Sequence, residues 1–109
     1  MSRSEIQERI LANASRLSVQ VAGAVWYVFG SFLAGHEAEN DIDLLIVYEL
    51  DGDDIVIRRY VAALLLSLPV HLLLASREEE RELNLIACIR GRRLYPESEA
   101  LMKASANVT

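Results

Sequence analysis

Cysteine and aromatic residues are scarce in this sequence, and each shortage narrows the possible folds. Cys88 is the single cysteine, so the chain cannot form an internal disulfide, as is usual in a reducing compartment. Aromatic residues make up only 6% of the chain, so we expect a core of mainly aliphatic side chains. Cys88 stands in an apolar stretch, for which we predict a buried and unreactive thiol.

Positive charge and long apolar runs are also lacking. The 11 Lys and Arg residues are outnumbered by 16 Asp and Glu residues, which gives a formal net charge of −5. Non-specific binding to nucleic acid needs a cluster of basic residues, so we expect no nucleic-acid interface. No apolar run reaches membrane-spanning length, and the N-terminal segment lacks the apolar centre of a signal peptide. We therefore expect a cytoplasmic protein that does not contact a membrane.

The remaining composition is that of one globular domain. Hydrophobic residues make up 52% and charged residues 25% of the 109-residue chain. A chain of this length can bury a core without the help of disulfides or structural metals. We predict a single domain over residues 1–109, in which 104–109 form a frayed tail.

The spacing of apolar residues predicts alternating helices and strands. Apolar residues recur every three or four positions in the helical segments, and β-branched or aromatic residues form short runs in the strands. The predicted helices are 4–17, 54–67 and 77–90, and the predicted strands are 24–29, 42–48, 70–74 and 92–95. Strand 42–48 is apolar almost throughout, which favours a central place in its sheet. This order predicts an α/β (α+β) fold, with a mixed β-sheet of three to four strands and helices packed against it.

Two of the predicted helices carry further signals. Ser76 and Glu79 have the spacing of a capping box at the start of helix 77–90, and Gly91 is its predicted C-cap. Helix 54–67 is apolar over most of its circumference, so more than one of its sides must be covered. We expect the protein's own sheet and helices to cover it, and a surface for a partner is the alternative.

The first candidate functional residues are Asp41 and Asp43, at the mouth of strand 42–48. Side chains two apart on a strand project to the same side, so both carboxylates point one way. Like charges so close disfavour each other's ionised form unless a cation lies between them, and Mg²⁺ is typically held by one or two carboxylates plus substrate phosphates. The alternative is that Asp41 is a turn residue and Asp43 an ordinary charge at a strand end.

Gly30 and Ser31 are the second pair of candidates. They follow the apolar strand 24–29 and precede segment 32–40, which we expect to be a turn or a short helix. A glycine there lets the backbone approach a ligand closely, and backbone N–H groups at a helix start together with the Ser31 hydroxyl can bind phosphate oxygens. An ordinary strand-to-helix turn is the alternative for this pair.

The two pairs together carry a family resemblance. A strand ending in Val-Phe-Gly-Ser at 28–31, nine intervening residues and then Asp-Ile-Asp-Leu at 41–44 resembles the signature of the nucleotidyltransferase superfamily, which includes DNA polymerase beta. The leading helix, the strand 70–74, the capped Glu-rich helix and the closing Gly-Arg-Arg-Leu-Tyr resemble the minimal bacterial form of that family. The likeness spans almost the whole chain and implies the nucleotidyltransferase fold.

The resemblance also implies roles for the candidate residues. Gly30 and Ser31 would hold the triphosphate of a nucleoside triphosphate, and Asp41 and Asp43 would coordinate Mg²⁺ (or Mn²⁺) bridging those phosphates. The implied reaction is attack of an acceptor hydroxyl on the α-phosphate of ATP or another nucleoside triphosphate, with transfer of a nucleotidyl group such as AMP and release of pyrophosphate.

His71 marks a departure from the family pattern. Family members usually carry a third carboxylate on the next strand, at the position that this chain fills with His71. Imidazole is a poor ligand for Mg²⁺ but can act as a general base near neutral pH, so we group His71 with Asp41 and Asp43 as catalytic residues. A hydrogen-bonded strand histidine is the alternative, and Glu49 or Glu78 could replace the missing carboxylate.

The resemblance further implies a partner. The minimal bacterial form often works beside a small helical protein in a toxin–antitoxin pair and transfers AMP to it, so a protein acceptor is expected here. The alternative is a catalytically degenerate nucleotidyltransferase that acts as a non-enzymatic binding or antitoxin module. A structural domain without a nucleotide site is a third interpretation, and a homodimer is compatible with the first two.

Overall fold

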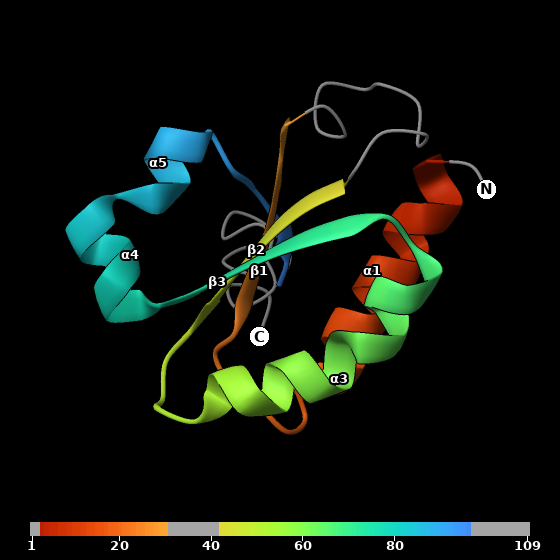
Figure 1. The fold of residues 1–109 in the computed structure, drawn as a ribbon, viewed down its shortest axis with the longest axis horizontal. Helices are drawn as coiled ribbons and strands as arrows, with labels where there is room; N and C mark the ends of the chain where they lie inside the picture. Colours follow the sequence, from red (N-terminus) through yellow and green to blue (C-terminus); the bar gives the residue numbers. More distant parts are fainter. Residues whose placement is uncertain (1–2, 31–41, 97–109) are drawn as a thin grey trace, which may run out of the picture.

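The computed structural model describes residues 3–30 and 42–96 of the chain (Figure 1). The predicted turn or short helix at 32–40 and the predicted tail at 104–109 lie outside these residues. The described elements, in chain order, are α1 (Arg3–Leu17), β1 (Val25–Phe29), β2 (Ile42–Tyr48), α3 (Asp53–Ser67), β3 (Val70–Ser76), α4 (Arg77–Leu83), α5 (Leu85–Ile89) and β4 (Arg92–Tyr95). The predicted α+β fold class is confirmed.

The four described strands form one mixed sheet in the order β3-β2-β1-β4. β1 pairs with β2 and with β4 in antiparallel fashion, whereas β2 and β3 run parallel. β2 lies centrally, as its apolar sequence predicts, and its residues from Leu44 to Val47 are at most 1% exposed. β3 continues to Ser76, two residues beyond the predicted end, because it pairs with β2 as far as Tyr48.

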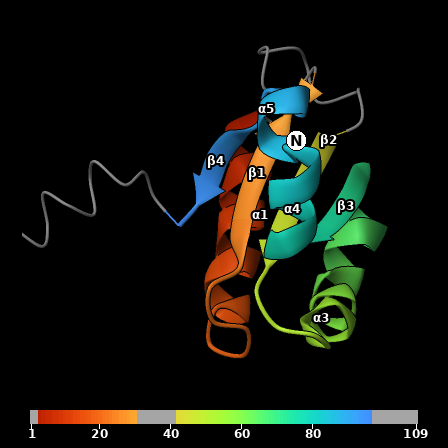
Figure 2. The ribbon, with the colours of Figure 1, turned by 90° about the vertical axis from the view of Figure 1, so that its left-hand side faces the viewer.

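The main core lies between the sheet and the helix pair α1 and α3. Figures 1 and 2 show these two helices on one side of the sheet and α4 with α5 on the other. Alternate residues of β1 and β2 face α1 and α3, because strand side chains alternate between the two faces. These core side chains are mostly aliphatic, as predicted, with Trp26 the large exception: Ile10, Leu17, Trp26, Ile42, Leu44, Ile46, Ile57 and Val61.

A second, smaller cluster lies on the other face of the sheet. It consists of the intervening strand residues and the apolar side chains of α5: Val25, Tyr27, Leu45, Val47 and Ala75, with Phe29, Leu85, Ile86 and Ile89 packed against them. The predicted capping box starts α4, since the Ser76 hydroxyl accepts from the Glu79 N–H at 3.1 Å and the Glu79 carboxylate accepts from the Ser76 N–H at 2.9 Å. That prediction is confirmed.

The predicted continuous helix 77–90 is wrong in its second half. Asn84 separates α4 from α5. It takes a left-handed conformation (φ 52°), which asparagine tolerates better than most residues. Arg90 (φ 55°) ends α5 in place of the predicted Gly91. The break turns Leu85, Ile86 and Ile89 toward the sheet, so Cys88 faces solvent. The prediction of a buried thiol is therefore also wrong.

α3 buries only one of its apolar sides. Ile57, Val61 and Leu64 pack into the main core, while Ile55 is 58% and Leu66 is 91% exposed. The expectation that the protein itself covers most of this helix is wrong, because α1 and the sheet contact it from one direction only. In the part of the chain that the structure describes, no helix is both long and apolar enough to cross a membrane.

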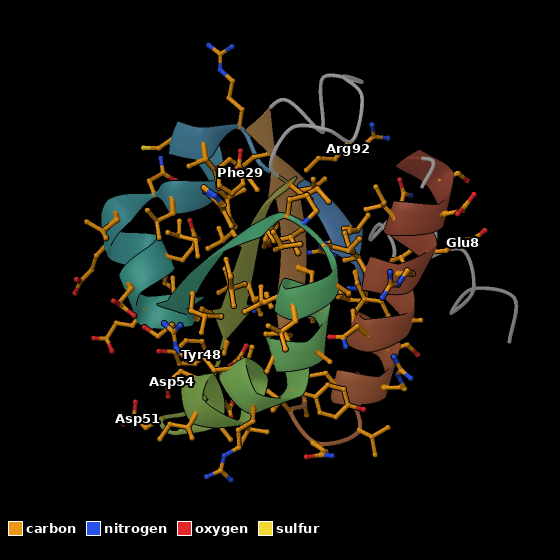
Figure 3. The ribbon with its side chains drawn as sticks, turned by 45° about the vertical axis from the view of Figure 1, so that its right-hand side comes forward. Glu8, Phe29, Tyr48, Asp51, Asp54 and Arg92 are labelled. Carbon is orange, nitrogen blue, oxygen red and sulfur yellow. The ribbon has the colours of Figure 1, made fainter. Side chains whose placement is uncertain are left out.

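The end of the sheet where β2 leads into α3 is acidic. Burial raises the pKa of the Tyr48 phenol above its usual value, and the carboxylates of Asp54, Glu79 and Asp51 raise this pKa further. Figure 3 shows Tyr48, Asp51 and Asp54 together at this end. The guanidinium of Arg58 lowers this pKa and so offsets part of the effect.

We expect Ser76→Ala to lower the free energy of unfolding by about 1 kcal/mol, because the substitution removes the acceptor that caps the Glu79 N–H. Urea unfolding of the whole chain measures this. Ser15→Ala, at an exposed site within α1, is the matched control and should be neutral or slightly stabilising, since alanine is the better helix former. Equal effects of the two substitutions would contradict a capping role for Ser76.

Candidate active site

Three strands bring their functional residues to one edge of the sheet. β1 ends at Phe29, where the antiparallel β2 and the parallel β3 begin, so these three ends meet (Figure 1). Phe29 pairs with Asp43, and Asp43 pairs with His71, which places the three residues in one row across the sheet. The sequence predicted Asp43 and His71 as site residues, and the strand register makes them direct neighbours.

The row lies on the sheet face that carries α4 and α5. Phe29 packs against the second core cluster, and residues paired across a sheet project to the same face as Phe29. A shallow pocket with a volume of about 370 Å³ opens at this position, lined by Phe29, Asp43, His71, Leu72 and Leu73. This volume lies near the lower limit for sites that take small organic ligands.

Asp43 and His71 differ in their access to solvent. Oδ1 of Asp43 lies 4.0 Å from Nδ1 of His71, which is within electrostatic range but too long for a hydrogen bond. The Asp43 side chain is 28% exposed and the His71 side chain is 68% exposed. The carboxylate is thus held at the floor of the pocket, while the imidazole stands at its rim and can meet an incoming group.

Gly30 packs its backbone directly against the carboxylate of Asp43. Its φ of 73° lies in the left-handed region that favours glycine, and a Cβ added there would overlap Oδ2 of Asp43. The sequence predicted that Gly30 lets the backbone approach a ligand closely. In the structure the group that approaches is the carboxylate of Asp43, so Gly30 and Asp43 form one unit.

The other two sequence-predicted site residues, Ser31 and Asp41, lie outside the described residues. Ser31 follows Gly30 directly, and Asp41 precedes the first residue of β2. Their predicted roles in phosphate and metal binding therefore remain predictions from the sequence.

Glu49 and Glu78 lie too far from the site to replace a third carboxylate. Glu49 follows the far end of β2, six positions beyond Asp43, which places it about 20 Å away along the strand. It is held there by Arg77, whose Nε lies 2.7 Å from the Glu49 carboxylate. Glu78 follows the end of β3, which runs parallel to β2, so it also lies at the far end of the sheet.

Among the described residues, Asp43 could supply part of the coordination of a divalent cation. The described residues include no cluster of three or more His, Cys, Asp or Glu side chains, so Asp43 would supply one carboxylate ligand, with the imidazole of His71 beside it. Mg²⁺ uses one or two carboxylates and completes its shell with water and phosphate oxygens. Two neighbouring ligands on one octahedral cation with bonds of roughly 2.1 Å lie about 3 Å apart. The 4.0 Å between Oδ1 of Asp43 and Nδ1 of His71 is wider, so Asp43 would hold the cation and His71 would lie beside it without binding it.

Phe29 and Leu73 are site residues that sequence reasoning missed. Both line the pocket, and Leu73 is 42% exposed although it is a large apolar residue. Alternation along the strands gives the signal that could have found them, since Phe29 stands opposite Asp43 and Leu73 lies two residues beyond His71.

Comparisons of the chain with models of known protein families, with curated proteins and with solved structures found no match. The architecture, a four-stranded mixed sheet with helices on both faces, is compatible with a nucleotidyltransferase-like fold. What the site can do must be read from its own residues.

We expect Gly30→Ala to lower the free energy of unfolding more than Gly52→Ala. Both glycines have positive φ, so each substitution adds backbone strain of about 1–2 kcal/mol. Only at Gly30 does the new methyl group meet Asp43, which adds a further ~1–3 kcal/mol, whereas a Cβ at Gly52 meets nothing. Urea unfolding measures both substitutions.

The same pair can be tested in the Asp43→Ala background. Removing the carboxylate removes the overlap, so the excess cost of Gly30→Ala over Gly52→Ala should disappear. An excess that persists without the Asp43 carboxylate would show that Gly30 does not pack on Asp43.

Proposed function

We propose that this protein is a nucleotidyltransferase that transfers a nucleotidyl group, AMP when the substrate is ATP, to an acceptor hydroxyl. The observation that carries the proposal is the contact between the Gly30 backbone and the Asp43 carboxylate, with His71 paired beside Asp43. Residues from the two parts of the Gly-Ser and Asp-x-Asp pattern thus meet at one edge of the sheet, as a nucleotide-metal site requires.

Asp43 would hold a divalent cation together with Asp41, and Gly30 and Ser31 would face the phosphates of the nucleotide. A cation bound there neutralises phosphate charge and stabilises the oxygens that develop charge in the reaction. Asp43 suits this role because its carboxylate is partly exposed and is fixed by the paired strands and by Gly30. The site also lies at the opposite end of the sheet from the acidic residues around Tyr48.

His71 would accept the proton of the acceptor hydroxyl. The hydroxyl oxygen forms a bond to the α-phosphorus, the bond from that phosphorus to the bridging oxygen breaks, and pyrophosphate leaves. The proton passes to the imidazole, which stands at the rim of the pocket with most of its surface in solvent. A positioned general base typically contributes about 10²–10⁴-fold to the rate.

The acceptor would come from outside the described pocket, and a hydroxyl on a partner protein fits best. A volume of about 370 Å³ has no room for both a nucleoside triphosphate and a second substrate. The exposed apolar residues Ile55, Leu65 and Leu66 on α3 offer contact area for such a partner or for a second copy of the chain.

The same exposed residues favour a second candidate function. A degenerate nucleotidyltransferase could bind a partner through α3 and neutralise it without catalysis, for example as an antitoxin. Under this candidate, Asp43 substitutions leave partner binding intact, because Asp43 lies on the sheet face opposite to α3.

Calorimetry with ATP tests the proposed site. We expect ATP to bind in the presence of Mg²⁺ or Mn²⁺. Asp43→Asn should weaken this binding more than about 10-fold, because substitution of a residue that only orients a metal ligand already lowers affinity by about that factor. Asp51→Asn is the matched control, because it removes an exposed carboxylate at the other end of the sheet and should leave the affinity unchanged.

The outcomes separate the two candidates. Cation-dependent ATP binding that is lost in Asp43→Asn supports the nucleotide site, and transfer of labelled AMP to a protein then supports the enzyme. If neither ATP nor any other nucleoside triphosphate binds, the proposed enzyme activity is contradicted and the non-enzymatic binding module is the remaining candidate. Equal losses in Asp43→Asn and Asp51→Asn would remove Asp43 from the site.

A further inference from the structure

The two edges of the described sheet differ in how they are protected against another strand. An edge strand presents a row of backbone N–H and C=O groups, and proteins usually guard it with a short length, charged residues or a bulge. β4 is four residues long, carries Arg92 and Arg93, and shifts its register against β1 between Trp26 and Tyr27. This edge is therefore guarded in all three ways.

The opposite edge, β3, has none of these features. It is seven residues long, and only His71 and Ser76 among its residues are not apolar. It pairs with β2 without a register shift from Val70 to Ser76, and no described strand lies beyond it (Figure 2). Leu73, at its centre, is 42% exposed. We propose that β3 pairs in antiparallel fashion with β3 of a second copy of this chain, about a two-fold axis through Leu73.

The backbone of β3 directs its hydrogen-bonding groups as this pairing requires. The N–H of Ile42 donates to the carbonyl oxygen of Pro69 at 2.7 Å, which fixes the register of the parallel ladder. In this ladder Leu73 directs its N–H and C=O toward β2, while Leu72 and Leu74 direct theirs away from it. With Leu73 on the axis, Leu72 lies opposite Leu74 of the second copy. Each of the two equivalent pairs can then exchange both of its N–H···O bonds.

The side chains match in the same register. Leu73 meets Leu73 of the second copy in a non-hydrogen-bonded pair, the type in which the two Cα atoms are only about 4.5 Å apart. This contact covers an apolar side chain that the single chain leaves partly exposed. β3 contains no Lys, Arg, Asp or Glu, so the pairing places no like charges opposite each other although each chain carries a formal net charge of −5.

A second copy fits this edge better than an unrelated extended peptide, because the strand is complementary to itself. Leucine occupies the central position and both hydrogen-bonded positions beside it. Seven residues span about 23 Å, and the strand with α3 beside it is about 20 Å thick, so the interface would bury roughly 900 Å² in total. Interfaces of this size belong to weak, reversible complexes, so we expect a dissociation constant in the micromolar range.

The pairing would also join the two candidate active sites. His71 and Leu73 line the pocket and lie on β3 itself. In the proposed register His71 lies opposite Ala75 of the second copy, so the two His71 residues are roughly 13 Å apart along the strands. Both pockets then open on the same face of the joined sheet, and Leu73 of the second copy completes the rim of each. The pairing itself does not depend on the proposed function.

Sedimentation equilibrium of the whole chain over about 1–500 μM tests the self-association. We expect a monomer–dimer equilibrium, and we expect Leu73→Lys to raise the dissociation constant more than about 10-fold, because two lysines would face each other across the axis. Val19→Lys is the matched control and should change nothing. Val19 is 87% exposed and follows Ser18, whose hydroxyl accepts from Tyr95 of β4 at the other edge. Circular dichroism checks that each variant folds.

Oxidative cross-linking tests the register without adding charge. Both variants are made in a Cys88→Ser background, because Cys88 is exposed. Leu73→Cys places two thiols at the axis, where the Cα separation falls near the lower end of the roughly 4.4–6.8 Å that disulfides span. His71→Cys places them roughly 13 Å apart, although this position is more exposed. We expect a covalent dimer from Leu73→Cys and at least about 10-fold less from His71→Cys.

A chain that stays monomeric at the highest concentration would overturn the proposal, and so would equal cross-linking of the two cysteine variants. A dimer that Leu73→Lys leaves unchanged, with no cross-link from Leu73→Cys, would place the contact elsewhere, for example on the exposed side of α3. ATP binding is measured separately, so failure of the nucleotide site and failure of the β3 pairing are distinguishable.

Discussion

The burial of β2 on both faces is the constraint on which the rest of the structure depends. Leu44 and Ile46 pack under α1 and α3, while Leu45 and Val47 pack under the second cluster. A slip of one residue in either pairing would exchange the two faces of the strand. Asp43 would then point into the main core, where an unpaired carboxylate is strongly disfavoured. The apolar residues of β2 thus hold Asp43 between Phe29 and His71 and against Gly30.

The sequence was sufficient to predict the elements whose signal is local. Apolar periodicity predicted α1, β2 and α3 to within one residue at each end, and the capping box at Ser76 gave the start of α4. Prediction from the sequence failed where contacts between residues distant in the chain decide the local structure. The break at Asn84 follows from the pull of Leu85, Ile86 and Ile89 toward the sheet, which no local pattern around Cys88 records.

The residues of the candidate site could be named from the sequence, but their geometry could not. The residue types and spacing of Gly30 and Asp43 indicated a nucleotide and a metal, yet only the strand pairing shows that the glycine packs on the carboxylate. Pairing also removed Glu49 and Glu78 as substitutes for a third carboxylate and left His71 in that position.

Charge and burial divide the molecule into chemically different regions. The carboxylates near Tyr48 lie at one end of the sheet, whereas Asp43 and His71 lie at the other end. The face of the sheet opposite to Asp43 carries α3 with its exposed apolar side. Under the proposed function, nucleotide chemistry and partner contact would therefore occur at separate surfaces.

Paramagnetic broadening by Mn²⁺ in the presence of ATP tests the central claim most directly. If Asp43 holds the cation, the amide signals of Gly30, Asp43 and His71 should broaden first, while those of Tyr48 and Glu49, at the far end of the same strand, stay sharp. Broadening centred on the acidic residues around Tyr48, or spread evenly over the chain, would contradict a metal-nucleotide site at Asp43.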